Sequence, residues 1–467
     1  MTNLSSIAGF SSGGGGAGAG GSATPLVADT PTSSVQVPIH AATGTNRSIS
    51  GQGHGWIGGQ CTNGVLKSRN TFGHWVHYSD DTAGAFKQGT AMTPITVNRS
   101  TGAITVGTPQ DVWVNTNVAT GAVNYNTTLI YEPVHGCFIN SGIAGWDTSS
   151  STEYAYGHAY GQLQTDGTVT LQASTTNNAS ATMNKYGSRC IALPQGTGTQ
   201  HTIHPSNYSY GSYYKAEATS TGWQNVGSTT FPHTGSYSYF GQHYYQPDIA
   251  AVDTTLPASV INMQHSASTY GYYVNHNGTV FDVDAPNNPI YAGVPEVFLR
   301  DDKPIVYYNN STSIFTPHWS GSGFELAEQT TSSTSPEANQ FNQYFHISGK
   351  GYNQIIGMGA NRYLMFGQKD TTCNLDYGEA QLIGVKADYS LERLAYFSVP
   401  DPTGNVLTAH SYMYNHDFFT VYENDTDANP KWLITLSQPS YVGVGLKDVT
   451  AESYEITADL TAYATST

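Results

Sequence analysis

The chain has few charged residues and few of the residues that build surface helices. Of its 467 residues, only 11% are Asp, Glu, Lys or Arg. Because Glu, Lys and Arg are good helix formers at exposed positions, we expect almost no long helix. The 17 basic residues are outnumbered by 33 acidic ones, and the formal net charge of -16 repels phosphate backbones and anionic lipid surfaces. We therefore expect no nucleic-acid partner.

Cysteines and long apolar runs are also scarce. No run of about 18 apolar residues is present, so we expect no membrane insertion, and residues 1–10 lack the basic start and apolar core of a secretory signal. The few cysteines lie far apart without a CxxC pair, and we predict that they are free and buried. They are Cys61, Cys137, Cys190 and Cys373.

Tyrosine, glycine and small polar residues take the place of the missing charges. The chain holds 33 Tyr and 50 Gly, with many Ser, Thr and Asn. Aromatic and β-branched side chains fit a pleated surface, and Gly and Asn supply tight turns. The composition therefore predicts an all-β protein.

A unit of four short strands is clearest between residues 296 and 330. Strands are expected at 296–300, 304–308, 313–319 and 324–330, separated by turns that contain Asp, Asn, Ser or Gly. Four strands in about 35 residues match one blade of a β-propeller. The same order of strands and turns identifies the other units of the chain.

Similar units recur along the chain, and the total is about seven. They span residues 66–106, 127–171, 186–233, 248–286, 355–399 and 406–437. The first two strands of a unit are short and apolar and the last two are longer and more polar, as expected of strands that run from an axis to a rim. We predict a β-propeller of about seven four-stranded blades. A β-sandwich, a β-helix and a triple-stranded fibre are the alternatives that period alone leaves open.

The composition divides the chain into three parts. Residues 1–35 form a glycine-rich N-terminal arm with too few large apolar groups to fold alone, residues 36–438 form the propeller, and residues 439–467 form a small C-terminal β appendage. Residues 35–39 either complete the last sheet or lie outside a ring that closes without them.

Three sequence segments resemble the propeller-repeat structural proteins of tailed bacteriophages. They are Leu4-Ser-Ser-Ile-Ala-Gly-Phe10 before a polyglycine run, Tyr160-Gly-Gln-Leu-Gln164 before Asp166-Gly167-Thr168, and the segment 441–450 near the C-terminal end. The resemblance implies a virion protein of the tail or capsid surface, assembled in the host cytoplasm and involved in host attachment. It also implies that the arm binds other virion proteins and that blade loops contact a host surface glycan or protein.

Tyrosines are unusually dense between residues 208 and 245. A tyrosine offers a flat apolar face with a polar tip, so such a cluster can stack on sugar rings or pack against a protein partner. Alternatively, tyrosines at period two stabilise a sheet as cross-strand pairs. The candidate binding residues are Tyr208, Tyr210, Tyr213, Tyr214, Tyr237, Tyr239, Tyr244 and Tyr245.

Histidine pairs do not predict a metal centre. Residues three apart on a strand face opposite sides, which separates His201 from His204 and His74 from His77. His54 with Cys61 lacks a third ligand at zinc-like spacing. We expect neither a metal nor a cofactor.

Catalytic signals are weak. Asp80 and Asp81 only faintly resemble an aspartate-box turn, and Arg300 beside Asp301 and Asp302 fits a tight turn in which Asp bonds locally. We therefore expect a non-catalytic protein with no catalytic residues, not an enzyme. The alternatives are a polysaccharide-depolymerising or sialidase-like glycoside hydrolase on the same scaffold, and a secreted lectin-like protein.

Overall fold

The computed structural model describes somewhat more than half of the positions in the chain, as a series of separate segments. The described residues are 24–38, 47–57, 67, 69–80, 87–115, 128–132, 136–147, 153–164, 166–177, 191–195, 199–205, 212–219, 221–230, 240–244, 257–264, 270–276, 279–284, 296–300, 303–310, 313–319, 324–330, 354–366, 379–387, 391–400, 416–437 and 449–465.

These residues are almost entirely β-strand, which confirms the all-β prediction. The helical exception among them is one short 3₁₀ turn, Leu460–Ala462 (η4), whose N-cap Asp459 accepts a hydrogen bond from the Thr461 amide. Within the described segments no helix is long and apolar enough to cross a membrane.

The described strands form seven sheets. Sheet 1 contains β3 (Arg47–Ile57), β4 (Thr71–Asp80), β5 (Lys87–Val97), β6 (Ile104–Val106) and β7 (Gln110–Asn115). Sheet 2 contains β8 (Thr128–Glu132), β9 (Cys137–Asp147), β10 (Glu153–Leu163) and β11 (Val169–Asn177). Sheet 3 contains β12 (Ile191–Gln195), β13 (Thr199–Pro205), β14 (Ser212–Thr219) and β15 (Gly222–Thr230).

The remaining sheets follow in chain order, and the last two take a strand from the N-terminus. Sheet 4 contains β16 (Phe240–Tyr244), β17 (Pro257–Gln264), β18 (Tyr270–His276) and β19 (Thr279–Asp284), and sheet 5 contains β20 (Glu296–Arg300), β21 (Lys303–Asn310), β22 (Ser313–Trp319) and β23 (Phe324–Thr330). Sheet 6 contains β24 (Gln354–Gly359), β25 (Arg362–Phe366), β26 (Glu379–Val385), β27 (Leu391–Ser398) and β1 (Thr24–Pro25). Sheet 7 contains β28 (His416–Val421), β29 (Trp432–Ser437), β30 (Val449–Glu455) and β2 (Ser33–Val37).

The four-strand unit expected at 296–330 is confirmed by sheet 5. Its strands pair antiparallel in sequence order, and Arg300 pairs with Lys303 across the first hairpin. The unit predicted to begin at residue 66 begins earlier, because β3 starts at Arg47. Residues 47–57 are rich in Gly and Ser, so they lack the apolar run that marks a strand in the sequence.

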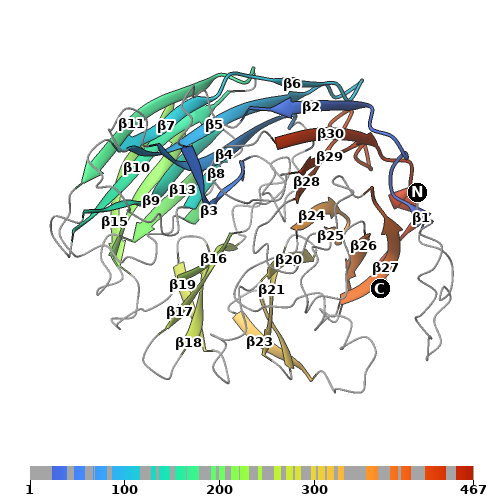
Figure 1. Ribbon diagram of the computed structural model, residues 1–467. Helices are drawn as coiled ribbons and strands as arrows, with labels where there is room; N and C mark the ends of the chain where they lie inside the picture. Colours follow the sequence, from blue (N-terminus) through green and yellow to red (C-terminus); the bar gives the residue numbers. More distant parts are fainter. Residues whose placement is uncertain are drawn as a thin grey trace.

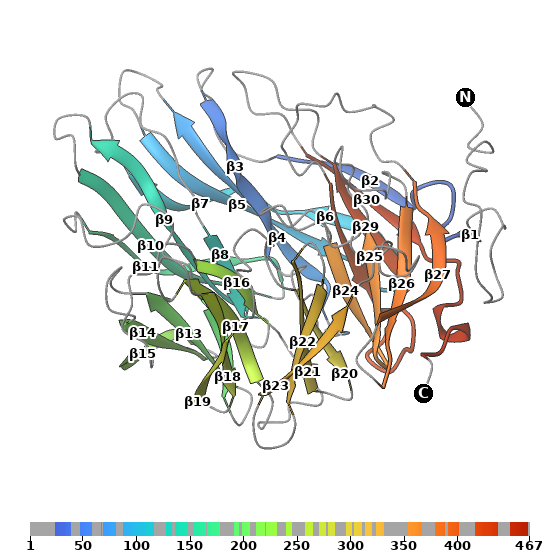
Figure 2. The same ribbon diagram turned by 90° about the horizontal axis from the view of Figure 1, so that it is seen from below.

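Consecutive sheets contact one another through equivalent strands. The first strand of one sheet contacts the first strand of the next at β3 and β8, β8 and β12, β12 and β16, β16 and β20, and β24 and β28. Sheet 7 contacts sheet 1 through β2 and β30 against β6. Figures 1 and 2 show the sheets following one another in chain order, with β2 beside β30. Neighbouring sheets therefore place their first strands next to each other.

Sheet 7 contains strands from both ends of the chain, so the arm and the C-terminal appendage do not have the boundaries expected from the sequence. The N-terminal strand β2 pairs antiparallel with β30, from Ser33 opposite Ser453 to Val37 opposite Val449. Residues 24–25 and 33–35, assigned above to the arm, thus lie in sheets, and residues 449–455 form a central strand rather than an appendage. The physical reason for this central position is the alternating burial along β30. Val449, Ala451 and Ser453 lie on one face of the strand and are buried.

Two apolar clusters fill the spaces on either side of sheet 7. Phe419 belongs to the cluster shared with sheet 1, and its ring centroid lies 3.8 Å from that of Phe72. Its neighbour Phe418 belongs to the cluster shared with sheet 6 and stacks on Phe366 at 4.4 Å. Successive residues of a strand point to opposite faces, so this Phe-Phe pair ties sheet 7 to both neighbours.

Candidate functional site

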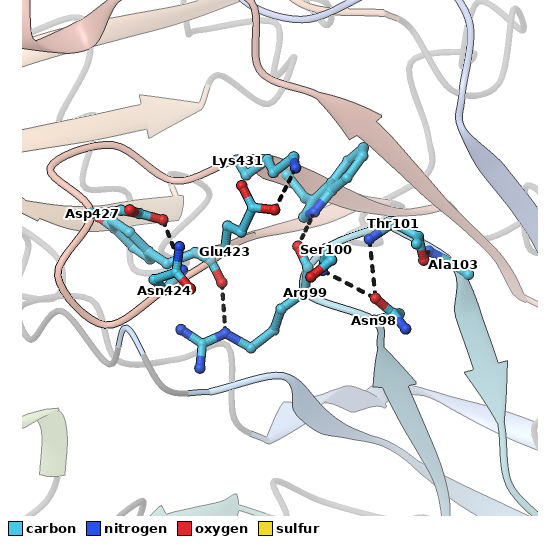
Figure 3. A network of polar contacts seen from close by, with 11 residues as sticks. Asn98, Arg99, Ser100, Thr101, Ala103, Glu423, Asn424, Asp427 and Lys431 are labelled. Atoms are coloured by element: carbon cyan, nitrogen blue, oxygen red, sulfur yellow. Dashed lines mark hydrogen bonds and ion pairs between the residues drawn. The ribbon is translucent and has the colours of Figure 1, made fainter.

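The best-defined polar cluster lies where sheet 1 meets sheet 7 (Figure 3). It begins with the turn between β5 and β6, which we call the Arg99 turn (residues 98–103). The side-chain oxygen of Asn98 accepts hydrogen bonds from the amides of Ser100 and Thr101, both at 3.0 Å. Gly102 closes the turn with φ of 71°, a conformation that glycine adopts without steric cost. Arg99 is therefore held at the tip of a rigid turn.

The Arg99 guanidinium spans three segments. Its Nε donates to the carbonyl of Tyr422 at 2.7 Å, and its Nη2 donates to the carbonyl of Lys67 at 2.9 Å. The same Nη2 lies 2.6 Å from the Asp425 carboxylate. Tyr422 and Asp425 belong to sheet 7 and its first turn, so one side chain fastens sheet 1 to sheet 7.

Trp432 completes the junction from the other side. Its indole Nε1 donates to the carbonyl of Arg99 at 2.6 Å, and its ring packs on Gly102. The hydroxyl of Ser453 donates to the carbonyl of Gly102 at 2.6 Å. The backbone of the Arg99 turn is thus bonded to β29 and β30 at once.

The acidic side chains of this cluster already have hydrogen-bond or ion-pair partners within the protein. Glu423 accepts from the Lys431 ammonium at 2.8 Å, Asp425 pairs with Arg99, and Asp427 accepts from the amide of Asn424 at 2.7 Å. A glycoside hydrolase needs two carboxylates that face one bond of the substrate, one as acid and one as base or nucleophile. The contacts of these three carboxylates instead indicate that the cluster holds two sheets together.

The structure describes three of the eight candidate tyrosines, and these three lie in two sheets. Tyr213 and Tyr214 are adjacent in β14 of sheet 3, paired with Pro205 and His204 of β13. Tyr244 ends β16 in sheet 4, opposite Ser259. The other five, Tyr208, Tyr210, Tyr237, Tyr239 and Tyr245, lie outside the described residues.

The structure places several of the candidate histidines in strands, and it places Asp80 in a strand rather than in the turn expected from the sequence. His201 and His204 lie in β13, paired with Glu217 and Tyr214 of β14. Asp80 ends β4 between Arg47 and Lys87 on the neighbouring strands. Among the described residues no three His, Cys, Asp or Glu side chains are grouped so that they could hold a metal ion. Asp81, Asp301 and Asp302 lie outside the described part of the chain.

Sequence reasoning found the turn at Ser100-Thr101-Gly102 but missed the role of Arg99 and of Trp432 beside it. The turn residues signal a hairpin in the sequence. They do not identify its partner, because Arg99 and Trp432 are 333 positions apart and no local pattern links them.

The chain is similar to known proteins in its fold and not in its sequence. No protein-family model matches the chain, and no curated protein sequence does. A sialidase from Streptococcus pneumoniae is similar in structure, with 11% identity over 88% of this chain and 70% of that chain and a TM-score of 0.39. An exo-β-1,3-galactanase from Phanerochaete chrysosporium matches with 10% identity over 63% of this chain and 67% of its own, at a TM-score of 0.29. The β-propeller domain of the Trilobed protease from Pyrococcus furiosus matches with 8% identity over 76% and 99% of the two chains, at a TM-score of 0.30.

These matches correct one expectation. The sequence led us to expect a protein that is not an enzyme, and this is contradicted because the sialidase and the galactanase, both enzymes, are among the similar structures. We withdraw the non-catalytic assignment. Identities of 8 to 11% nevertheless carry no activity from those proteins to this chain.

Proposed function

We propose that this chain is a glycan-directed enzyme on a closed seven-bladed β-propeller, of the polysaccharide-depolymerising or sialidase-like glycoside hydrolase class. We further propose that it works on the surface of a tailed-phage particle. There, residues 1–23 would attach it to other virion proteins while the loops between strands meet a host surface glycan.

The observation that carries the proposal is the sheet shared by the two chain ends. Strand β2 pairs with β30, and both strands contact β6 of sheet 1. A sheet built from both termini fixes the first and last units to each other, and such a ring holds its connecting loops on a rigid base. Enzymes commonly build substrate sites from loops of this kind.

Composition supports a glycan rather than a nucleic acid as the substrate. The net charge of -16 disfavours nucleic acid, whereas 33 tyrosines provide faces on which sugar rings stack. The phage location rests on the resemblance of residues 4–10, 160–170 and 441–450 to virion propeller proteins.

The topology also limits where a catalytic pair would lie. In a propeller the first strands surround the axis, where loops from all blades converge. The first strands described here, β3, β8, β12, β16, β20, β24 and β28, carry three carboxylates: Glu132, Glu296 and Asp417. Glu296 begins β20 and Asp417 is the second residue of β28, so both stand at the start of an inner strand. In a ring of equivalent blades this places them at one end of the axis, and Glu132, which ends β8, at the other.

The test is turnover of polysaccharide by the purified full-length protein. Incubation with capsular polysaccharide and lipopolysaccharide should release new reducing ends, and sialylated glycans should be included to detect free sialic acid. We expect Glu296→Gln or Asp417→Asn to slow turnover about 100-fold or more, the usual effect of losing a catalytic acid or base. Glu452→Gln is the matched control, since Glu452 lies on β30 and bonds Ser34 of the outer strand β2. Binding of glycan without any turnover would reject the enzyme proposal in favour of an adhesive protein.

The phage location is tested separately. Mass spectrometry of purified particles should detect the full-length chain. A variant lacking residues 1–23 should remain folded and be missing from particles. Incorporation of that truncated variant at the normal level would remove the docking role of the arm.

A further inference from the structure

Residues 24–38, which we call the strap, lie across three consecutive sheets. At its beginning the strap joins sheet 6, where Thr24 and Pro25 pair in parallel with Phe397 and Ser398 of β27. The amide of Leu26 continues this pairing by donating to the carbonyl of Ser398 at 2.9 Å. The side chain of Leu26 is fully buried in the cluster between sheets 6 and 7.

The middle of the strap runs along sheet 7. The amide of Ala28 donates to the carbonyl of Glu455 at 2.9 Å, and that of Thr32 donates to the carbonyl of Ser453 at 2.8 Å. Strand β2 then pairs with β30 as far as Val37, whose side chain is fully buried in the cluster between sheets 1 and 7. The strap thus supplies buried side chains to both faces of sheet 7, Leu26 and Val27 on one face and Val37 on the other.

The end of the strap reaches sheet 1. The hydroxyl of Thr93 in β5 donates to the carbonyl of Pro38 at 2.6 Å. The amide of Ile104 in β6 donates to the hydroxyl of Ser33 at 3.3 Å. Sheets 6, 7 and 1 are therefore fastened by one short segment, at the place where the C-terminal part of the chain meets its N-terminal part.

The C-terminal tail is bonded to the same segment. The amides of Thr457 and Ala458 both donate to the carbonyl of Leu26, at 3.0 and 3.2 Å, and Val27 forms a β-bridge with Ile456. Leu460, further along the tail, is fully buried beside the strap. Displacement of the strap therefore removes partners from the tail and from β6, β27 and β30 at once.

We propose that the strap is a releasable clasp: its departure exposes the edge of β30, loosens β6 and β27 and frees the C-terminal tail, while the Arg99 turn still joins sheets 1 and 7 and the sheets far from the strap stay folded. Sheets 2 to 5 are antiparallel meanders of consecutive strands and take no strand from the strap. Sheet 7 keeps only β28, β29 and β30 without the strap, and its edge strand β30 then presents unpaired amides and carbonyls to water. Release of the strap requires neither a glycan nor a phage particle, and it loosens one defined region of the chain.

The experiment separates the strap from a protein that has already folded. A protease site is placed between residues 41 and 44, in the connection between the strap and β3, and the folded protein is cut. The cut chain is then incubated with an excess of a synthetic peptide of residues 22–38 that carries a fluorophore. We expect the original strap to stay bound after the cut and to exchange for the labelled peptide.

Hydrogen–deuterium exchange on the cut chain then measures the open state. After the strap is washed away in mild denaturant, peptides that cover β30, β6 and residues 457–465 should exchange at least tenfold faster, with β9 and β10 of sheet 2 unchanged. Addition of the 22–38 peptide should restore the slow exchange. Unchanged exchange at β30 and β6, or equal loss of protection in every sheet, would overturn the clasp.

A matched pair of substitutions tests the same device in the uncut chain. Val37→Asp places a charge in the buried position of β2, whereas Gln36→Asp places it on the exposed face one residue earlier. The first should reproduce the fast exchange at β30 and β6, and the second should leave exchange within about twofold of the parent. If both variants behave alike, the buried anchoring of the strap does not control exchange at β30 and β6, and the proposal is wrong.

Discussion

Gly102 lies against the face of the Trp432 indole, so close that a Cβ on this glycine would stand 2.7 Å from the Cε3 and Cζ3 atoms of the ring. Gly102 comes from the turn between β5 and β6, and Trp432 begins β29. Real Cβ atoms do not approach a ring carbon that closely, so the two sheets meet at a point where only glycine fits.

We predict that Gly102→Ala lowers the free energy of unfolding by about 3 kcal/mol or more. About 1 kcal/mol arises from the positive φ, and the rest from the overlap with Trp432, which has to shift and give up packing. Gly167→Ala is the control, since Gly167 also has a positive φ, 85°, but its Cβ would meet ordinary contacts at 3.5 Å and beyond. Chemical denaturation should therefore show a cost of about 1 kcal/mol for the control. Equal costs for the two variants would contradict the close fit.

We predict that Arg99→Ala destabilises the protein far more than Asp425→Ala. Arg99 donates to two backbone carbonyls in addition to the carboxylate, and hydrogen bonds from a charged group contribute about 1.5–3 kcal/mol. The Asp425 side chain is 62% exposed, and ion pairs in such positions contribute about 0–1 kcal/mol. Urea denaturation at two salt concentrations provides the comparison, and a large, salt-sensitive loss for Asp425→Ala would show that the ion pair dominates the junction.

We predict that Ala360→Asn stabilises the protein by about 0.5–1 kcal/mol. Ala360 and Asn361 form the two-residue loop of the β24–β25 hairpin, with φ of 51° and 60°. This conformation suits Asn better than Ala, whose Cβ crowds the following carbonyl. The control is Ala428→Asn at an exposed turn position without positive φ, which should not raise the melting temperature. A matching rise in the control would point to a general surface effect.

We predict that the C-terminal tail loosens in acid because of Asp459. The hydroxyl of Thr461 donates to this carboxylate at 2.6 Å and the amide of Thr461 donates at 3.0 Å, which lowers the pKa of Asp459 below its ordinary value of 3.8. A group whose pKa is lowered by folding contributes stability above its ordinary pKa, and the contribution is lost as the pH falls through the folded value. Hydrogen exchange of residues 457–465, corrected for intrinsic rates, should accelerate between pH 5 and pH 3.

The variant Asp459→Ala provides the reference for this acid effect. It should show the faster tail exchange already at pH 5 and little further change on acidification, since the titrating group is gone. An equal acid response in the parent and the variant would mean that another carboxylate controls the tail.

Local pattern predicted the regular parts of this fold well. The strands and turns of residues 296–330 follow directly from alternating apolar residues and from Asp, Asn and Gly at the turns. Strand β30 was misassigned to an appendage, because the segment Val-Thr-Ala-Glu-Ser-Tyr-Glu carries only small and mixed side chains on its buried face. The pairing partner of this strand, β2, lies more than 400 residues away. No local sequence pattern identifies a partner at that distance.

Composition and short-range periodicity determined that this chain forms strands, repeats a four-strand unit and lacks long helices, because strand and turn preferences act between residues close in sequence. Which segments complete sheet 7, which glycine must accommodate Trp432 and which carbonyls Arg99 bonds were decided only by tertiary structure. Those contacts join residues hundreds of positions apart, and they form only when the sheets bury their apolar faces against each other.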